Sequence, residues 1–404
     1  MKKFLIIIII LLFTPALARA ASLGQKLSGQ ILLDVERNGE AWYIYPENNK
    51  RYYLGRPADA FAVMRELGLG ITELDFQKIA QAGMPVAGDQ SLAKKLSGKI
   101  ILQVEKNGEA WYIYPKDLKK YYLGRPADAF AIMRQLGLGI NREDLSMVHK
   151  PDLAESINQY SKYEHKVIFT QSGEFIIDIA EINLSNPNLK ITTDTVKPWP
   201  DKASSLGAFR AQSLGKFVLE NNGFAGINGT YFCSSSGCGA QNYYFYPVYD
   251  TSDKILVNES ELKYWTTGPI MAWDENNKFY YFKDSREFVE VEDFENKYGV
   301  KLQAAIGNKP RLIEKGMNLL IEWDIDDKQR NTKALRNAIA YKNNVIYLVV
   351  AQNATVPDLA DVMQAMEVEY ALNLDGGLSS ALWYNDEYMV GPGRDIPNAI
   401  IFAE

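Results

Sequence analysis

The hydrophobic pattern of the first 140 residues occurs twice. Residues 27–71 read LSGQILLDVERNGEAWYIYPENNKRYYLGRPADAFAVMRELGLGI, and residues 96–140 read LSGKIILQVEKNGEAWYIYPKDLKKYYLGRPADAFAIMRQLGLGI. The two copies are identical at 35 of 45 positions without a gap. In each copy, short apolar runs alternate with turn residues, as in strands, and the last part has the spacing of an amphipathic helix. The pattern therefore predicts two small repeats with the same fold.

The second copy shows the elements that we expect in both. They are a strand at 100–105, a hairpin turn at Asn107-Gly108, a return strand at 110–114, a third strand at 121–123 and a helix at 127–136. Asn-Gly favours a tight hairpin because both residues tolerate a positive φ. Each copy is therefore predicted to be a three-stranded meander with one helix. Because such a unit is small, the two copies are expected to pack together or on the rest of the chain.

Ten aromatic residues are concentrated in the strands of the repeats. They are Trp42, Tyr43, Tyr45, Tyr52, Tyr53, Trp111, Tyr112, Tyr114, Tyr121 and Tyr122. Their rings could stack on sugars and hold the protein on a cell-wall glycan. The alternative is that half of them, at alternating positions along the strands, form the core.

The first twenty residues have the pattern of a secretory signal peptide. Lys2 and Lys3 precede the apolar run 4–13, and Ala18-Arg19-Ala20 has small residues at the positions that a signal peptidase reads. This run is short for a membrane span, and no later run is long and apolar enough to cross a bilayer. We therefore expect a secreted or cell-surface protein that has no transmembrane segment once residues 1–20 are removed.

Charge and cysteine content narrow the function further. The formal net charge of −6 becomes more negative when the basic signal peptide is lost, and no long basic run occurs, so nucleic-acid binding is not expected. The two cysteines, Cys233 and Cys238, are predicted to form a local disulfide in an exported chain. A metal site is the weaker interpretation because no third or fourth soft ligand lies nearby in the sequence.

From residue 166 onward the pattern changes to longer, β-rich segments. Residues 206–221 and 356–366 have helical spacing, and the apolar run 371–374 predicts a short buried strand. Strands with separate helices indicate the α+β class. We expect a mixed twisted β-sheet with packed helices at 166–404, preceded by the two small β-meander-plus-helix repeats.

Five segments of this region carry candidate chemistry. They are Asn228-Gly229-Thr230-Tyr231-Phe232, Gly307 to Leu312, Arg336 to Ala340, Asn373 to Ser380 and Arg394 to Ala399. In this order they resemble the phosphodiester glycosidase family, over roughly residues 166–404 and not over the repeats. The resemblance implies hydrolysis of a sugar joined through its anomeric carbon to a phosphate. The sugar and aglycone are expected to belong to a surface polysaccharide or glycoconjugate.

Three positions depart from the family pattern. Thr230 and Leu378 stand where the family has glycine, and Asn337 stands where it has threonine. A positive φ at the third position of the glycine turn would strain Leu378. These departures keep open a second hypothesis, a non-catalytic glycan-binding protein with a decayed enzyme domain.

The residue types suit the implied reaction. Asp375 could stabilise or attack the oxocarbenium-like transition state, and a phosphate monoester leaves readily, so one carboxylate could suffice. Arg336 and Arg394 could bind phosphate oxygens, and Asn228 could contact a sugar hydroxyl or orient Asp375. Alternatively, the arginines form structural ion pairs and Asn228 is a turn residue.

The remaining candidate residues surround these four. Backbone N–H groups at Gly376-Gly377, and at a helix expected to start near Ser379 and Ser380, could form an anion site. Gly229, Thr230 and Asn373 complete the predicted substrate-binding set. The only histidines, His149 and His165, lie outside the motifs, which argues against Ser-His-Asp or His-rich zinc chemistry. A divalent cation could assist a phosphate-linked substrate, but the sequence shows no ligand set for it.

Overall fold

The computed structural model describes residues 21–85, 88–151, 159–200, 209–235, 240–264, 268–320 and 324–404. They form two compact units that divide between Asp144 and Leu145. We expected the boundary near residue 166; the second unit begins earlier because Met147 packs against one of its hydrophobic clusters. The predicted signal peptide, residues 1–20, lies outside the described residues.

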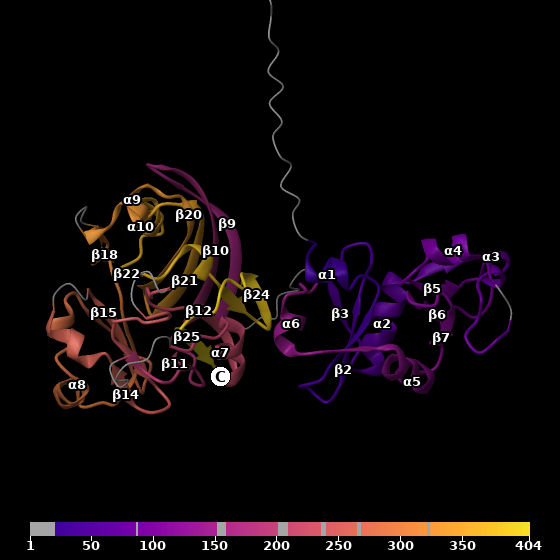
Figure 1. Ribbon diagram of the computed structural model, residues 1–404, viewed down its shortest axis with the longest axis horizontal. Coiled ribbons are helices and arrows are strands. Elements are labelled where there is room, and N and C mark those ends of the chain that lie inside the picture. Colours follow the sequence, from indigo (N-terminus) through magenta and orange to yellow (C-terminus); the bar gives the residue numbers. More distant parts are fainter. Residues whose placement is uncertain are drawn as a thin grey trace, which may run out of the picture. The chain divides into compact units, whose positions relative to one another are not determined.

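The repeat unit contains the meander and the helix in each copy. Its elements are α1 (Leu23–Lys26), β1 (Ile31–Asp34), β2 (Glu40–Ile44), β3 (Arg51–Tyr53), α2 (Pro57–Leu67), β4 (Leu69–Ile71), α3 (Glu73–Lys78), α4 (Gln90–Lys95), β5 (Ile100–Gln103), β6 (Glu109–Ile113), β7 (Lys120–Tyr122), α5 (Pro126–Leu136) and β8 (Leu138–Ile140), followed by α6 (Arg142–Ser146) (Figure 1). The predicted elements match to within two residues at each end. The fourth strand of each copy was not expected, because three residues carry too short a pattern to identify a strand.

The two copies exchange this fourth strand. Strand β4 of the first copy pairs in parallel with β5 of the second, and β8 of the second copy pairs in parallel with β1 of the first. Two four-stranded sheets result, with the orders β3-β2-β1-β8 and β4-β5-β6-β7. Each exchanged strand covers an edge that would otherwise expose unpaired backbone groups, so neither sheet is complete without the other copy.

The centre of the repeat unit is a close contact between equivalent glycines. A Cβ atom on Gly29 would lie 2.6 Å from the Cα atom of Gly98. The hydroxyl of Tyr43 donates to the Gly98 carbonyl at 2.7 Å, and Tyr112 donates to the Gly29 carbonyl at 2.6 Å. Both tyrosines are completely buried, so these two of the ten aromatic residues form the core.

This contact gives a matched test of how the repeats pack. Gly29 and Gly39 both have a positive φ, 75° and 73°, but a Cβ on Gly39 meets nothing within 4 Å. Gly39→Ala should lower the free energy of unfolding by about 1 kcal/mol, the cost of backbone strain alone. Gly29→Ala adds a backbone clash and should cost at least about 2 kcal/mol more. Chemical denaturation of both variants measures the difference, and equal losses would contradict the packing.

The C-terminal unit contains three sheets, and every strand pairing described in it is antiparallel. The first has the order β19-β18-β22-β20-β21-β10-β9, with β9 (Ser161–Thr170), β10 (Gly173–Asn183), β18 (Arg311–Glu314), β19 (Met317–Asn318), β20 (Ala334–Lys342), β21 (Val345–Ala354) and β22 (Tyr370–Asn373). The second has the order β11-β25-β12-β23-β24, with β11 (Lys190–Thr195), β12 (Gly223–Asn228), β23 (Leu382–Tyr384), β24 (Glu387–Val390) and β25 (Asn398–Ala403). The third has the order β14-β13-β17-β15-β16, with β13 (Val248–Asp250), β14 (Ile255–Val257), β15 (Ile270–Asp274), β16 (Phe279–Phe282) and β17 (Leu302–Gly307).

Short helices complete the unit. They are α7 (Leu214–Glu220), α8 (Val291–Tyr298), α9 (Asp327–Asn331), α10 (Val356–Ala365) and the 3-10 helices η3 (Glu259–Lys263), η5 (Ser285–Glu287) and η7 (Gly377–Ser379). The helix expected at 206–221 begins only at Leu214, where the Ser213 side chain caps it; residues 206–208 lie outside the described residues. The helix expected at 356–366 is α10, which begins at a capping box of Thr355 and Asp358.

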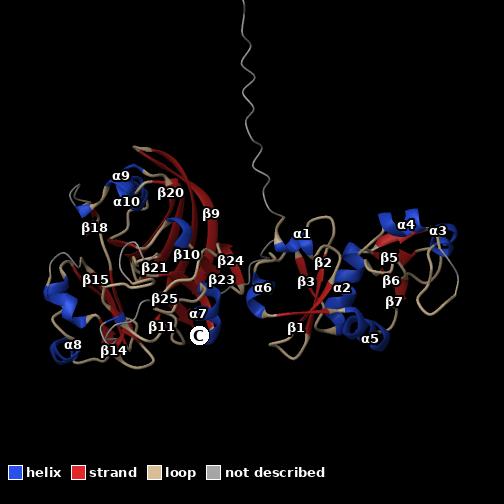
Figure 2. Cartoon of the chain, in the orientation of Figure 1, coloured by secondary structure: helices blue, strands red, loops and turns tan. Residues whose placement is uncertain are grey.

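The three sheets share one hydrophobic core. Ile339 of the first sheet, Phe402 of the second and Trp273 of the third belong to the same buried cluster, and α10 packs on the other face of the first sheet (Figure 2). The α+β class is confirmed, but three sheets stand where we expected one mixed sheet. Periodicity marks individual strands and does not show which strands pair, so it could not divide them among sheets.

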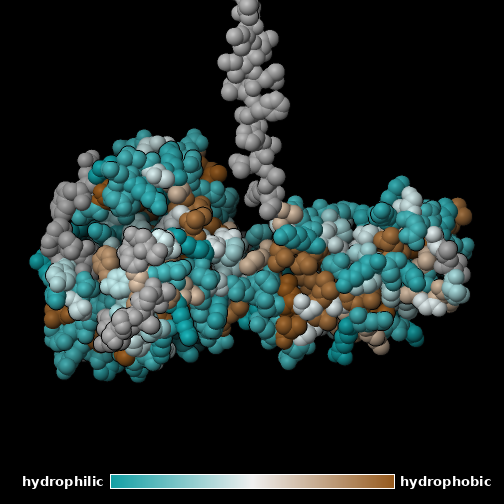
Figure 3. All heavy atoms as spheres, viewed as in Figure 1, coloured by the Kyte–Doolittle hydropathy of each residue, from teal (hydrophilic) through white to brown (hydrophobic). Residues whose placement is uncertain are grey.

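The surfaces of the two units differ on the face shown in Figure 3. Hydrophobic residues gather over β1–β3 of the repeat unit, whereas this face of the C-terminal unit is largely hydrophilic. Among the described residues, no helix has both the length and the apolar character needed to cross a membrane.

Candidate active site

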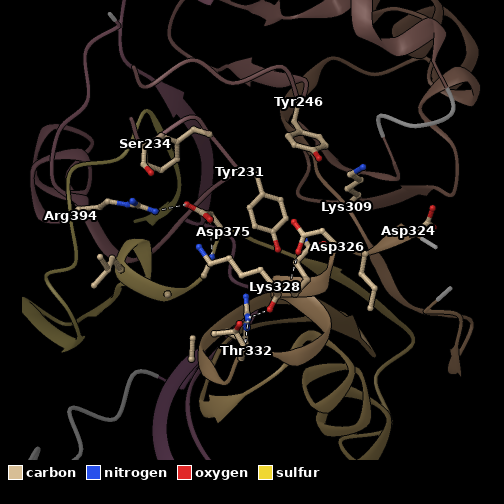
Figure 4. A pocket seen from close by; sticks show the side chains of 18 of the residues that line it. Tyr231, Ser234, Tyr246, Lys309, Asp324, Asp326, Lys328, Thr332, Asp375 and Arg394 are labelled. Carbon is tan, nitrogen blue, oxygen red and sulfur yellow. Dashed lines mark hydrogen bonds and ion pairs between the residues drawn. The ribbon is translucent and has the colours of Figure 1, made fainter. Parts of the chain in front are cut away.

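A cavity of about 740 Å³ lies in the C-terminal unit, where segments joined to all three sheets meet (Figure 4). It is lined by Tyr231, Phe232, Ser234, Phe245, Tyr246, Lys309, Asp324, Ile325, Asp326, Lys328, Gln329, Thr332, Ala334, Arg336, Asp375, Gly376, Gly377, Leu378 and Arg394. Five of the predicted site residues belong to this lining: Asp375, Gly376, Gly377, Arg336 and Arg394. The other predicted residues that the structure describes do not belong to this lining.

Strand register explains why Arg336 and Asp375 meet. Strand β22 is antiparallel to β20, with Asn373 opposite Ala338. Asp375 follows Asn373 by two residues, and Arg336 precedes Ala338 by two residues. In an antiparallel pair these two positions lie at the same end of the sheet. The predicted strand at 371–374 is therefore present, and it places Asp375 at the cavity as expected.

Asp375 is buried yet incompletely bonded. It is 7% exposed, and its Oδ1 accepts the Gly376 N–H at 3.0 Å. Among the described residues, its buried Oδ2 has no hydrogen-bond partner. Burial raises the pKa of Asp375 to about 6, although the Ser379 hydroxyl and the Arg394 charge act in the opposite direction. A buried carboxylate oxygen that lacks a hydrogen bond is costly for the fold, as is typical of functional sites.

Two cations act on Asp375. The Arg394 Nη2 atom lies 3.9 Å from Asp375 Oδ2 (Figure 4). The Nε atom of Arg394 donates to the Ser379 hydroxyl at 2.8 Å. The charge of Lys328, at the start of α9, also acts on Asp375 and lowers its pKa. Arg394 is one of the residues that the sequence predicted to bind phosphate, and Lys328 is a further cation in the cavity lining that no motif indicated.

Arg336 is held rigidly at the cavity. It is 5% exposed; its Nε donates to the Ala354 carbonyl at 3.2 Å, and its Nη2 donates to Thr332 at 2.6 Å and to Lys328 at 3.3 Å. These acceptors are backbone carbonyls, so Arg336 forms no structural ion pair in the part of the chain that is described. The Nη1 atom of Arg336 lies on the side of Gly376, and Arg336 belongs to the cavity lining.

Asn228 acts behind the cavity. It is completely buried at the end of β12, and its Nδ2 donates to the Asp375 backbone carbonyl at 2.7 Å. Its Oδ1 accepts from Asn337 Nδ2 and, at 3.1 Å, from the Ala381 N–H. Asn228 does not line the cavity, so these bonds do not support the predicted contact with a sugar hydroxyl. The alternative that we proposed, orientation of Asp375, agrees with these bonds.

Gly229 and Thr230 are structural in the same way. A Cβ on Gly229 would lie 2.0 Å from Asn398 Oδ1, so only glycine fits there. The Thr230 N–H donates to the same oxygen at 2.9 Å, and its hydroxyl accepts from Asn398 Nδ2 at 3.0 Å. The Asp375 N–H donates to the Gly229 carbonyl at 2.9 Å. These bonds join the second sheet to the turn after β22, and neither residue lines the cavity.

Asn373 positions Tyr231 from behind. Its Nδ2 donates to the Tyr231 hydroxyl at 2.7 Å, and its backbone carbonyl accepts from Asn308 Nδ2 at 2.8 Å. Burial raises the pKa of Tyr231 to about 12, with an opposing contribution from a hydrogen bond to Gln329. The phenol is therefore protonated at neutral pH and can donate a hydrogen bond to a ligand in the cavity.

The glycine turn differs from our expectation in two ways. Ser379 and Ser380 end the single 3-10 turn η7 and do not cap a helix. The N–H groups of Gly376, Ser379 and Ser380 already donate to Asp375 Oδ1, the Gly376 carbonyl and the Gly377 carbonyl. Most of the backbone N–H groups of the predicted anion site are therefore used in internal bonds of the turn.

Leu378 is not strained. The positive φ of this turn, 67°, falls on Gly377, and Leu378 points outward with 77% exposure. The loss of the family's third glycine is therefore compatible with an intact turn.

The predicted disulfide and the two histidines remain to be considered. Cys233 is buried, but Cys238 lies outside the described residues, so the disulfide stays a prediction. His149 and His165 line a different, smaller cavity with Asp178 and Glu387. Within the described ranges, no cluster of three or more His, Cys, Asp or Glu could hold a metal ion.

Residues 222–403 match the family model of the phosphodiester glycosidases, so the C-terminal part of this chain carries a phosphodiester glycosidase domain. The match does not extend to the repeats. No curated protein was found to match the sequence.

Solved structures resemble the chain more distantly. A hypothetical protein from Synechocystis aligns at 13% identity over 61% of this chain and 62% of its own, with a TM-score of 0.47. The catalytic domain of zebrafish N-acetylglucosamine-1-phosphodiester alpha-N-acetylglucosaminidase, auto-inhibited by its pro-peptide, aligns at 14% identity over 60% of this chain and 83% of its own, with a TM-score of 0.46. This chain thus spans less than two thirds of the Synechocystis protein.

Proposed function

We propose that the C-terminal domain hydrolyses the bond between the anomeric carbon of a sugar and a phosphodiester, in a surface polysaccharide or glycoconjugate. The family match supports a hydrolase acting on phosphodiester-linked sugars. The observation that carries the proposal is the buried Oδ2 of Asp375, which has no hydrogen-bond partner among the described residues and lies beside a cavity that also contains Arg394, Lys328 and Arg336. A buried carboxylate with cations beside it suits a substrate whose leaving group is a phosphate.

In the proposed reaction, the bond between C1 and the phosphate oxygen breaks, and its electron pair leaves with the phosphate. Ionised Asp375 stabilises the positive charge that develops at C1, or attacks it directly. Arg394 and Lys328 neutralise the leaving phosphate monoester, which needs no protonation to leave because its second pKa is about 6. Water supplies the hydroxyl group that completes the free sugar.

The aromatic wall provides a place for the sugar ring. Phe245 and Tyr246 stack with ring centroids 4.2 Å apart, and Tyr231 lies 6.3 Å from Tyr246. Asp324 and Asp326 also line the cavity and can accept hydrogen bonds from sugar hydroxyls. We expect the sugar to lie on the aromatic side and the phosphate on the side of Arg394.

The direct test is release of free sugar. The chain without residues 1–20 is incubated with UDP-N-acetylglucosamine and a panel of sugar-1-phosphate diesters, with and without divalent cations. Release of sugar together with a phosphate monoester supports the proposal. Comparison of the incubations with and without divalent cations shows whether a cation is needed. Binding of the same diesters without any release would favour the alternative, a non-catalytic glycan-binding protein.

The raised pKa of Asp375 predicts the pH profile. The carboxylate works in its ionised form, so kcat/KM should rise with pH, reach half its plateau near pH 6, and stay level to pH 8. Initial rates on one diester between pH 4 and pH 8 measure this. A midpoint near 4, the usual range of an exposed aspartate, would show that burial does not control the group.

Export of the chain completes the proposal. Residues 1–20 have a signal-peptide pattern, and a secreted or cell-surface location would give the domain access to surface polymers. The N-terminal residue of the protein purified from culture medium or cell envelope tests this. An intact N-terminus at Met1 would contradict cleavage.

A further inference from the structure

A second cavity lies in the repeat unit and has features of a ligand site. Its volume is about 300 Å³, and its lining includes Trp111, Tyr121 and Tyr122 together with Lys120, Arg125 and Asp128. Trp111 and Tyr122 pack edge to face with centroids 5.0 Å apart. Aromatic walls with a few charged groups are typical of sites that hold sugars.

Lys120 is the unusual member of this lining. It is 5% exposed; its Nζ donates to the Phe76 carbonyl at 2.6 Å and lies 3.6 Å from the centroid of the Phe76 ring. Among the described residues, no carboxylate lies within 4 Å of its Nζ. Burial lowers the pKa of Lys120, although the charge of Glu73 acts in the opposite direction. Burying a cation with no carboxylate in contact opposes folding, so stability alone does not explain its presence.

The first repeat supports a role for the charge itself. The equivalent residue is Arg51, which is 2% exposed and lies over the Trp42 ring at 4.9 Å. The copies differ at ten positions, and this one changed from one cation to another. An apolar residue would cost less to bury, yet neither copy has one.

An exposed ion pair beside the cavity has also been kept. Arg125 Nε lies 2.6 Å from Asp128 Oδ2, and the equivalent Arg56 and Asp59 are 3.7 Å apart. Exposed pairs of this kind contribute little to stability, at most about 1 kcal/mol. Arg125 can donate hydrogen bonds to the hydroxyl groups of a bound sugar, and Asp128 can accept hydrogen bonds from them.

We propose that this cavity binds an acidic saccharide, with the sugar ring against Trp111 and Tyr122 and its anionic group at Lys120. The ligand would bring an anion into contact with Lys120, whereas the carboxylate of Glu73 acts on it only from a distance. The anion is a carboxylate, as in a uronic acid, or a phosphate, as in a phosphorylated sugar. This site is independent of the proposed hydrolysis, and it would hold the enzyme on an acidic polymer.

The experiment measures binding to the chain of residues 21–404 carrying Asp375→Asn, so that no ligand is hydrolysed. Titration calorimetry is carried out with tetragalacturonate, with a phosphorylated tetrasaccharide and with a neutral tetrasaccharide. We expect at least one acidic ligand to bind, and Lys120→Met to weaken that binding at least about tenfold. The ligand that responds identifies the anion.

Controls separate this role from a structural one. Lys116→Met removes an exposed cation close in sequence and should leave binding unchanged, whereas Lys120→Arg, which copies the first repeat, should retain it. Lys120→Met should also raise the melting temperature, because it removes a buried, unpaired charge. Equal binding by Lys120→Met and Lys116→Met, equally tight binding of the neutral sugar, or no binding of either acidic ligand would overturn the proposal.

Discussion

Asp375→Asn should abolish turnover and make the protein more stable. The amide cannot stabilise positive charge at C1, so kcat should fall by about 10³-fold, the size of loss expected when one electrostatic contribution to the transition state is removed. At neutral pH the variant should unfold at a higher temperature, because it no longer holds an ionised carboxylate in a buried site. Initial rates and thermal denaturation at pH 7 measure both effects.

The stability gain should depend on pH in a defined way. The pKa of Asp375 is raised from 3.8 to about 6 in the folded protein, so the native state holds this proton more tightly than the unfolded chain does. The native protein therefore loses stability as the pH rises from about 4 through 6, by up to about 3 kcal/mol. The variant should lack this loss, so the difference between the two proteins grows across that window and is constant above it.

Asp178→Asn is the matched control. Asp178 is equally buried, but its carboxylate accepts from Tyr163 at 2.6 Å and from Gln352 at 3.0 Å, and lies 2.7 Å from His165 Nδ1. Its replacement should destabilise the fold by about 2 kcal/mol and leave activity unchanged, because it does not line the active-site cavity. If Asp375→Asn were also destabilising, the Asp375 carboxylate would be a structural group and its assignment to catalysis would fail.

Asn228→Ala should damage both stability and rate. The substitution removes the three hydrogen bonds to Asp375, Asn337 and Ala381, and leaves buried partners unsatisfied. We expect a loss of about 3 kcal/mol in the free energy of unfolding. Because the Asp375 backbone is no longer fixed, kcat should fall about 10²-fold while KM changes little, since Asn228 does not reach the cavity.

An exposed asparagine provides the comparison. Asn296 lies on α8 in contact with solvent, and Asn296→Ala should change neither quantity. Assays below the melting temperature of each variant separate the loss of rate from unfolding. If Asn228→Ala raised KM with kcat unchanged, Asn228 would contact substrate directly, contrary to the bonds described here.

The candidate active site consists of two layers of residues, which should tolerate substitution differently. The cavity wall contains Asp375, Arg336, Arg394 and Lys328, and behind it lies a group of buried asparagines: Asn228, Asn308, Asn337, Asn373 and Asn398. Asparagine suits this layer because one side chain both donates and accepts while carrying no charge. Through them the ends of β12, β20, β22 and β25 are joined, which fixes the turn that carries Asp375.

The sequence by itself determined the repeats, their strands and helix, the α+β class and the position of Asp375 at a strand end. These follow from patterns within a few residues, since turn residues and periodic burial are local. It also placed Arg336 and Arg394 in the motifs that line the cavity. It could not separate Asp375 from Asn228, Gly229 and Thr230, because a motif shows which residues occur together and not which of them face a ligand.

Only the tertiary structure decided the remaining features. The exchange of β4 and β8, the division into three sheets and the arrival of Lys328 beside Asp375 depend on pairings between residues distant in the sequence. The same holds for Ser379, which has a serine's local preference for capping a helix but bonds Arg394 instead. Burial also sets the raised pKa of Asp375, since desolvation depends on the surrounding fold and not on the neighbouring residues in the chain.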